Sequence, residues 1–152
     1  MFFQSLVILR HLGRKYALTG ATEDEQLRVE LAEQQAVDIR TALGRVVHNK
    51  ADFEPMSAER REKIPKELDL LEAFIGDRKF VAGDCVTYAD FLLYDALDFN
   101  RAFEPTAFEG RKIDEYLKRV ENLPKVKKYR DGPTYVKTMF SHRAVWGGPS
   151  KP

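Results

Sequence analysis

The sequence has almost no cysteine and no excess of charge of either sign. Of its 152 residues only Cys85 is a cysteine, so an intrachain disulfide is excluded and a secreted, disulfide-framed fold is not expected. The 25 Lys and Arg residues balance 24 Asp and Glu residues, which gives no reason to expect a nucleic-acid partner. We therefore expect a cytoplasmic protein held together by its hydrophobic core.

Long apolar runs and clustered metal ligands are also missing. No apolar run approaches the roughly 18 residues needed to span a bilayer, and no signal peptide or membrane anchor is recognisable. The three histidines, His11, His48 and His142, are far apart and lack a short ligand-pair spacing. We expect neither a membrane partner nor a bound metal.

Apolar residues make up 43% of the chain, and they recur at helical spacing almost everywhere. No stretch shows the period-two alternation of a half-buried strand flanked by turn signals. The pattern predicts an all-α fold.

The first predicted helix begins near Ser5, whose hydroxyl can serve as its N-cap. Ile8, Leu9, Leu12 and Tyr16 share one face of this helix. Such an apolar stripe at the start of a chain indicates that a preceding segment or a partner covers it, so we expect an N-terminal truncation.

A long helix is predicted from Thr22 to His48, because Thr22 and Glu25 form a capping box. One stripe should face the core: Ala32, Ala36, Ile39, Leu43 and Val47. A second stripe is mixed in polarity: Val37, Thr41, Gly44 and His48. The mid-helix Gly44 indicates a close approach to the backbone, either by a ligand or by another helix.

Further helices follow. Ser57 is predicted to start a helix that is kinked near Pro65 and ends at Gly76. Thr87 and Asp90 form a second capping box, which we interpret as structural. Shorter helices around residues 113–120 and from Pro124 precede a loosely structured tail that contains Phe140 and Trp146.

Several segments, in this order, resemble mu-class glutathione transferases: residues 4–10, 33–38, 86–98, 103–105 and 144–147. The resemblance implies a thioredoxin-like domain that binds glutathione, followed by a helical domain. Residues 1–18 would be the last helix of an otherwise missing thioredoxin-like domain, and residues 19–152 the glutathione transferase C-terminal helical bundle. A homodimer is implied for the full-length protein.

The resemblance also implies roles for individual residues. Gln4 and Ser5 would hold the γ-glutamyl end of glutathione, which is a co-substrate, and Asp38 would reach the γ-glutamyl amine in the neighbouring subunit. Without the family, Ser5 is an ordinary N-cap and Asp38 a solvated helix residue. Arg10 corresponds to an arginine at the dimer axis, although a surface salt bridge is the commoner role for arginine.

The hydrophobic electrophile pocket of the family implies a further set of contacts: Val37, Arg40, Thr41, His48, Phe140 and Ser141. The family commonly has a tyrosine where His48 stands. The imidazole of His48 either donates a proton to the substrate or faces solvent at the helix end.

The implied function is conjugation of the glutathione thiolate to hydrophobic electrophiles in detoxification. None of the six tyrosines stands at the position of the tyrosine that supports the thiolate in the family, so no catalytic residue is assigned. We expect this chain alone to conjugate glutathione poorly or not at all. The alternative is a non-catalytic helical module that binds a protein partner or carries a ligand.

Overall fold

The structure is a computed structural model that describes residues 4–136 and 140–149. This part of the chain contains α-helices, one 3₁₀ turn and no strand, as the sequence predicted. The elements are α1 (Ser5–Lys15), α2 (Glu23–His48), α3 (Phe53–Ile75), α4 (Tyr88–Phe103), η1 (Pro105–Ala107), α5 (Lys112–Glu121) and α6 (Pro124–Arg130).

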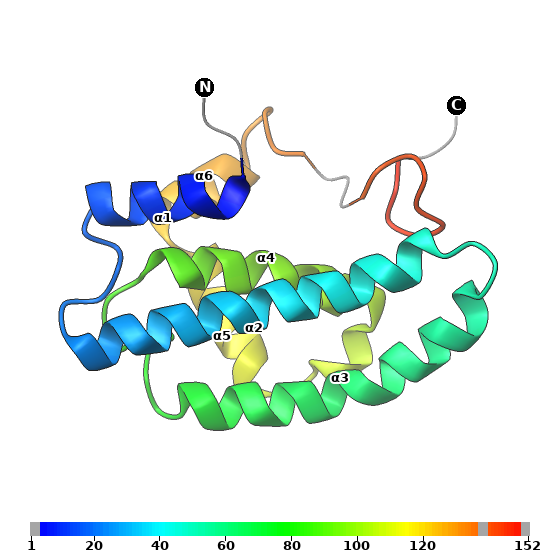
Figure 1. Ribbon diagram of the computed structural model, residues 1–152, viewed down its shortest axis with the longest axis horizontal. Coiled ribbons are helices and arrows are strands. Elements are labelled where there is room, and N and C mark those ends of the chain that lie inside the picture. The colour runs from blue at the N-terminus through cyan, green and yellow to red at the C-terminus, as the bar shows by residue number, and fades with distance from the viewer. Residues whose placement is uncertain (1–3, 137–139, 150–152) are drawn as a thin grey trace.

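Helix α2 is the longest element and runs through the middle of the molecule (Figure 1). Helix α4 packs along α2, and α3 runs beside α2 in the opposite direction after a tight turn. Helix α1 contacts α4, while the tail beyond α6 returns to the C-terminal end of α2. The first helix thus lies on α4, and the described part of the tail lies beside α2.

The beginning and the buried face of α2 confirm the sequence prediction. The Glu25 amide donates to Thr22 Oγ1 at 3.2 Å, and the Thr22 amide donates to Glu25 Oε2 at 3.3 Å. The predicted core stripe is buried throughout: Ala32, Ala36, Ile39, Leu43 and Val47. The reciprocal cap satisfies amides that the helix itself cannot bond.

The second capping box, at the start of α4, is completely buried. Asp90 accepts hydrogen bonds from the Thr87 amide at 2.7 Å and the Val81 amide at 2.9 Å. The Tyr116 hydroxyl of α5 donates to the same carboxylate at 3.0 Å. Burial raises the pKa of Asp90, and burial also raises that of Tyr116. This box joins the start of α4 to α5, consistent with its structural interpretation.

Two predicted helix starts are wrong. Ser5 is the first residue of α1 rather than its N-cap, because the Gln4 carbonyl accepts the first helical hydrogen bond, from the Ile8 amide at 3.2 Å. Helix α3 begins at Phe53 and not at Ser57. Asn49 Oδ1 accepts hydrogen bonds from the backbone amides of residues 51 and 52. These bonds shape the turn before α3.

The sequence also predicted a kink near Pro65, a helix end at Gly76 and a close approach to the backbone at Gly44. Pro65 lies inside one continuous α3, and Gly76, with φ of 61°, ends that helix as predicted. A Cβ atom built at Gly44 meets no atom within 4 Å among the described residues. The close approach expected at Gly44 is therefore not made by any of them.

Candidate functional site

The C-terminal end of α2 meets the tail at His48. His48 Nδ1 lies 2.8 Å from the Gly44 carbonyl oxygen, so the neutral ring carries its proton on Nδ1. Nε2 then accepts from the Ser141 hydroxyl, 3.3 Å away. The Phe140 ring meets the imidazole edge to face, with centroids 5.7 Å apart. Three residues proposed for the electrophile pocket thus come together from distant parts of the chain.

Aromatic rings extend this cluster along α4. Phe140 lies 5.2 Å from Phe99 and 6.4 Å from Trp146 between ring centroids. The Arg40 guanidinium lies 5.4 Å from the Phe99 ring centroid and also pairs with Asp95 of α4. These contacts connect Arg40 to the same surface. We call His48, Phe140, Ser141, Phe99 and Arg40 the α2–tail cluster.

A backbone hydrogen bond fixes the tail in place beside the cluster. The Val145 amide donates to the Val47 carbonyl oxygen at 2.7 Å. Trp146 packs edge to face on Phe103, with ring centroids 5.2 Å apart. The described part of the tail is therefore packed on the helices, more closely than the sequence predicted.

The other predicted residues lie elsewhere on the surface. Val37 is half-buried and Thr41 exposed, on the α2 face that ends at His48. Asp38 is exposed on α2, and its carboxylate pairs with no cation among the described residues. Gln4 and Ser5 are exposed at the N-terminal end of α1, where helix amides carry a partial positive charge.

Gln4 has an unusual backbone conformation for a residue other than glycine. Its φ is 76°, in the left-handed region, where a side chain costs energy. The strain lies directly beside Ser5, the other residue proposed to bind the γ-glutamyl group. Strained backbone of this kind is common at binding sites.

Sequence reasoning missed a buried cluster around Glu33 of α2. Arg10 Nε donates to Glu33 Oε2 at 2.8 Å, and a second guanidinium nitrogen of Arg10 bonds the other oxygen. The Tyr88 hydroxyl donates to Glu33 Oε2 at 3.0 Å, and Gln34 Nε2 donates to Glu33 Oε1 at 2.9 Å. The Glu33 side chain is 1% exposed. We call Arg10, Glu33, Gln34 and Tyr88 the Glu33 cluster.

The electrostatics of the Glu33 cluster favour a charged carboxylate. The hydrogen bond from Arg10 lowers the pKa of Glu33, whereas burial raises the pKa of Tyr88 to about 12. A sequence signal was present, since Glu33 is spaced four residues after the buried Val29 and three before the buried Ala36. Arg10 makes a salt bridge, the alternative role considered for it, with a buried partner.

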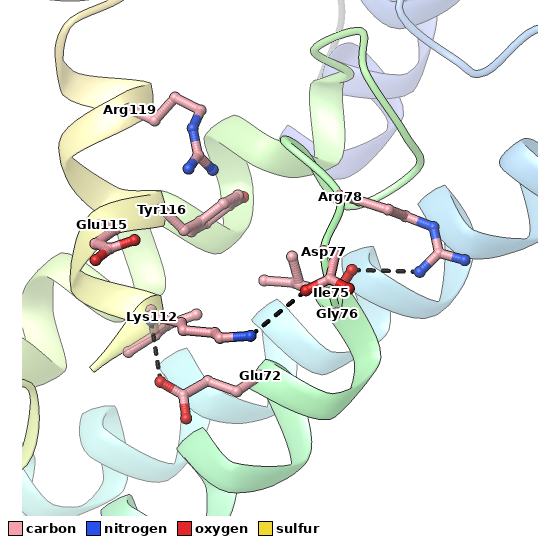
Figure 2. A pocket seen from close by; sticks show the side chains of 10 residues that line it. Glu72, Ile75, Gly76, Asp77, Arg78, Lys112, Glu115, Tyr116 and Arg119 are labelled. Atoms are coloured by element: carbon pink, nitrogen blue, oxygen red, sulfur yellow. Dashed lines mark hydrogen bonds and ion pairs between the residues drawn. The ribbon is translucent and has the colours of Figure 1, made fainter.

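A cavity of about 210 Å³ lies between the end of α3 and α5 (Figure 2). Several of the polar side chains that line it are bonded within the chain. Glu72 Oε1 accepts a hydrogen bond from the Ile113 amide at 3.0 Å, and Lys112 Nζ lies 3.5 Å from Asp77 Oδ1. Arg119 donates to the Lys79 carbonyl oxygen at 2.8 Å. These pairs join α5 to the end of α3 and to residues 77–79, which follow it.

Residues 4–136 and 140–149 contain no gathering of three or more His, Cys, Asp or Glu side chains suited to a metal ion. None of the helices in these ranges has the length and apolar character needed to cross a membrane.

Solved structures share this arrangement of helices. The glutathione S-transferase Blo t 8 matches with a TM-score of 0.86 and 34% identity, over 95% of this chain and 70% of that one. A pi-class glutathione S-transferase of Onchocerca volvulus matches with a TM-score of 0.76 and 27% identity, over 86% and 66% of the two chains. The fold is that of the helical part of a glutathione transferase.

Comparisons of the sequence lead to the same family as the comparisons of the structure. The family described as "Glutathione S-transferase, C-terminal domain" matches residues 37–132. Glutathione S-transferase Mu 1 of Bos taurus is 38% identical over 146 residues, and Mu 1 of Mus musculus is 41% identical over 145 residues. These matches cover 95% and 94% of this chain and 66% of each relative. The chain belongs to the glutathione S-transferase family and is mu-class-like.

Proposed function

We propose that this chain forms the helical, electrophile-binding part of a transferase that joins the glutathione thiolate to hydrophobic electrophiles in detoxification. The convergence of His48, Phe140 and Ser141 carries this proposal. Aromatic rings offer apolar contact area to an electrophile, while the hydroxyl and imidazole offer hydrogen bonds that orient it.

The proposed glutathione contacts lie on two helices. Gln4 and Ser5 would bind the γ-glutamyl carboxylate at the start of α1, since the partial positive charge of a helix N-terminus attracts an anion. The exposed Asp38 would bind the γ-glutamyl amine of glutathione held by a neighbouring subunit. This arrangement requires a homodimer, for which Arg10 is the proposed axis residue.

In the proposed reaction, the glutathione sulfur forms a bond to an electrophilic carbon as the leaving group departs. That step needs a stabilised thiolate. No tyrosine of this chain is assigned to this task, so the 152-residue polypeptide should conjugate poorly by itself. The complete transferase is proposed to act in the cytoplasm. Residues 1–18 would then belong to the glutathione-binding domain and residues 19–152 to the helical domain.

A turnover assay with glutathione and an activated aryl halide tests the assignment of roles. The purified 152-residue chain should give a rate close to the uncatalysed background. The same chain preceded by the thioredoxin-like domain of a mu-class relative should be active. A full transferase rate from the 152-residue chain alone would contradict the proposed division.

An alternative function is a non-catalytic interaction or ligand-carrying module. An apolar groove of about 210 Å³ between α2 and α3 favours it, because Leu31 and Leu70 are 52% and 73% exposed beside Phe74. Binding of a hydrophobic dye that is lost in Leu70→Ser and retained in Phe140→Ala would support this alternative.

A further inference from the structure

We propose that Glu33 is a positioning residue, which holds α1 against α2 and α4 and thereby sets the location of Gln4 and Ser5. The link to glutathione rests on the proposed function. The mechanical part, docking of α1, rests on the Glu33 cluster alone.

Three helices meet at the Glu33 carboxylate. Arg10 comes from α1, Glu33 from α2 and Tyr88 from the start of α4. Burying an ionised carboxylate without partners is costly, so such a group persists where donors surround it. Here a bidentate guanidinium, a phenol and an amide supply them. Moving α1 away would leave this buried charge without its strongest partner.

The apolar packing of α1 is sparse. Leu9 is partly buried against the core and Gly13 is the only buried residue of this helix, whereas Val7, Ile8 and Leu12 are 52%, 36% and 40% exposed. Gly13 lies against the Tyr88 ring, and the Tyr88 amide donates to the Leu18 carbonyl oxygen at 2.9 Å. Those contacts fix the C-terminal side of α1. The pair between Arg10 and Glu33 lies nearer the end that begins with Ser5.

Arg10 follows Ser5 by five residues on one helix, a separation of about 7.5 Å along its axis. A rotation of α1 at Arg10 is therefore transmitted to the exposed backbone at Gln4 and Ser5. Glu33 is itself buried, so its effect on glutathione would pass through Arg10 and not through direct contact.

Amide hydrogen exchange of the whole chain, measured residue by residue by NMR, tests this role in Glu33→Gln. Glutamine keeps the side-chain shape and removes the charge. Arg10 is 44% exposed and can be solvated, so the variant should fold. Exchange in α1 should become about tenfold faster, because a bidentate charge-assisted pair is lost. Amides of α3 and α5 should keep their protection.

Glu30→Gln is the matched control, since Glu30 lies one turn earlier on α2 and is exposed. It should leave exchange in α1 unchanged. Arg10→Gln removes the same pair from its exposed side and should reproduce the effect of Glu33→Gln. Unchanged α1 exchange in both Glu33→Gln and Arg10→Gln would overturn the proposal. Equal acceleration in α1, α3 and α5 would overturn it as well, because that pattern marks general destabilisation.

A glutathione titration distinguishes the docking of α1 by Glu33 from the effect of Glu33 on glutathione binding. In the wild-type chain preceded by the thioredoxin-like domain of a mu-class relative, glutathione should shift Gln4 and Ser5, and Glu33→Gln should weaken that binding by about tenfold while Glu30→Gln does not. Unchanged affinity in Glu33→Gln would refute the link to glutathione. If this fused wild-type protein does not respond at Gln4 and Ser5, the proposed function fails there, whereas the exchange data still decide whether Glu33 docks α1.

Discussion

Helix α2 makes two long-range connections of opposite character. At Glu33 it binds α1 and α4 through a side chain that is 1% exposed and bonded by three other residues. At His48 it binds the tail through an exposed imidazole, one hydroxyl and aromatic edges. The first connection is buried and the second is open to solvent.

The difference in exposure distinguishes a structural contact, at Glu33, from a candidate binding site, at His48. A buried carboxylate with all its donors in place resists rearrangement, since each lost partner leaves a buried polar group unsatisfied. An exposed imidazole and hydroxyl can exchange their mutual bond for water or a ligand at little cost. We therefore expect substitutions near Glu33 to change stability and substitutions near His48 to change ligand binding.

The largest contrast is expected between two glycines. A Cβ at Gly13 would lie 2.6 Å from Tyr88 Cδ1, whereas a Cβ at Gly44 meets no described atom within 4 Å. Gly44→Ala should stabilise the chain by about 1 kcal/mol through helix propensity. Gly13→Ala should destabilise it by about 1 kcal/mol, because the clash outweighs that gain. Urea denaturation measures both, and equal effects would show that α1 is not tightly docked.

Phe140→Ala should separate ligand binding from stability. We expect about tenfold weaker binding of a hydrophobic glutathione conjugate, since the ring contributes apolar contact area. The free energy of unfolding should change by less than about 1 kcal/mol, because Phe140 is only partly buried. Leu27→Ala, at the other end of α2, is the control and should leave binding unchanged. Isothermal titration and urea denaturation measure the two quantities.

Tyr88→Phe should lower the free energy of unfolding by about 1 kcal/mol, the usual contribution of one hydrogen bond. The ring keeps its packing, and only the bond from the hydroxyl to Glu33 is lost. Tyr135→Phe is the control, since its hydroxyl lies outside the Glu33 cluster. No loss of stability in Tyr88→Phe would indicate that Arg10 alone satisfies Glu33.

Acid should reduce the difference in α1 amide exchange between the wild type and Glu33→Gln. The folded state lowers the pKa of Glu33 below its ordinary value of 4.5. Its contribution is therefore fully present above pH 4.5 and is lost as the pH falls through the folded-state pKa. The α1 exchange rates of both proteins between pH 7 and pH 3, each divided by the intrinsic exchange rate at that pH, check this sign. A difference that grows on acidification would contradict it.

The smallest effect on stability is expected for Ser141→Ala. Its bond to His48 is 3.3 Å long and exposed, so its loss should cost less than about 0.5 kcal/mol. The His48 side chain should nevertheless change its NMR shifts, because the donor to Nε2 is removed. A loss of more than 1 kcal/mol would show that the tail contact is as structural as the Glu33 cluster.

Local signals explain which parts of the fold were predictable. Both capping boxes, at Thr22 and Thr87, involve residues three apart, so their spacing is visible in the sequence. The start of α3 was missed because the Asn49 side chain shapes the preceding turn, and Ser57 imitated a cap. A true cap and a buried helical serine look alike when only neighbours are considered.

Long-range contacts explain what was not predictable from composition or periodicity. Glu33 is buried only because Arg10 and Tyr88, 23 and 55 residues away, surround it. His48 and Ser141 are 93 residues apart, and only the family resemblance placed them in one pocket. Periodicity identifies a helix face, but the partners of that face depend on tertiary packing.

The most direct test is an NMR titration of this chain, preceded by the thioredoxin-like domain of a mu-class relative, with S-hexylglutathione, which joins a glutathione moiety to an apolar chain. If the α2–tail cluster forms the electrophile-binding surface, His48, Phe140 and Ser141 should shift in a saturable manner, together with Gln4 and Ser5. Shifts confined to Leu31 and Leu70 in the groove between α2 and α3, or no saturable shifts at all, would contradict the proposed site.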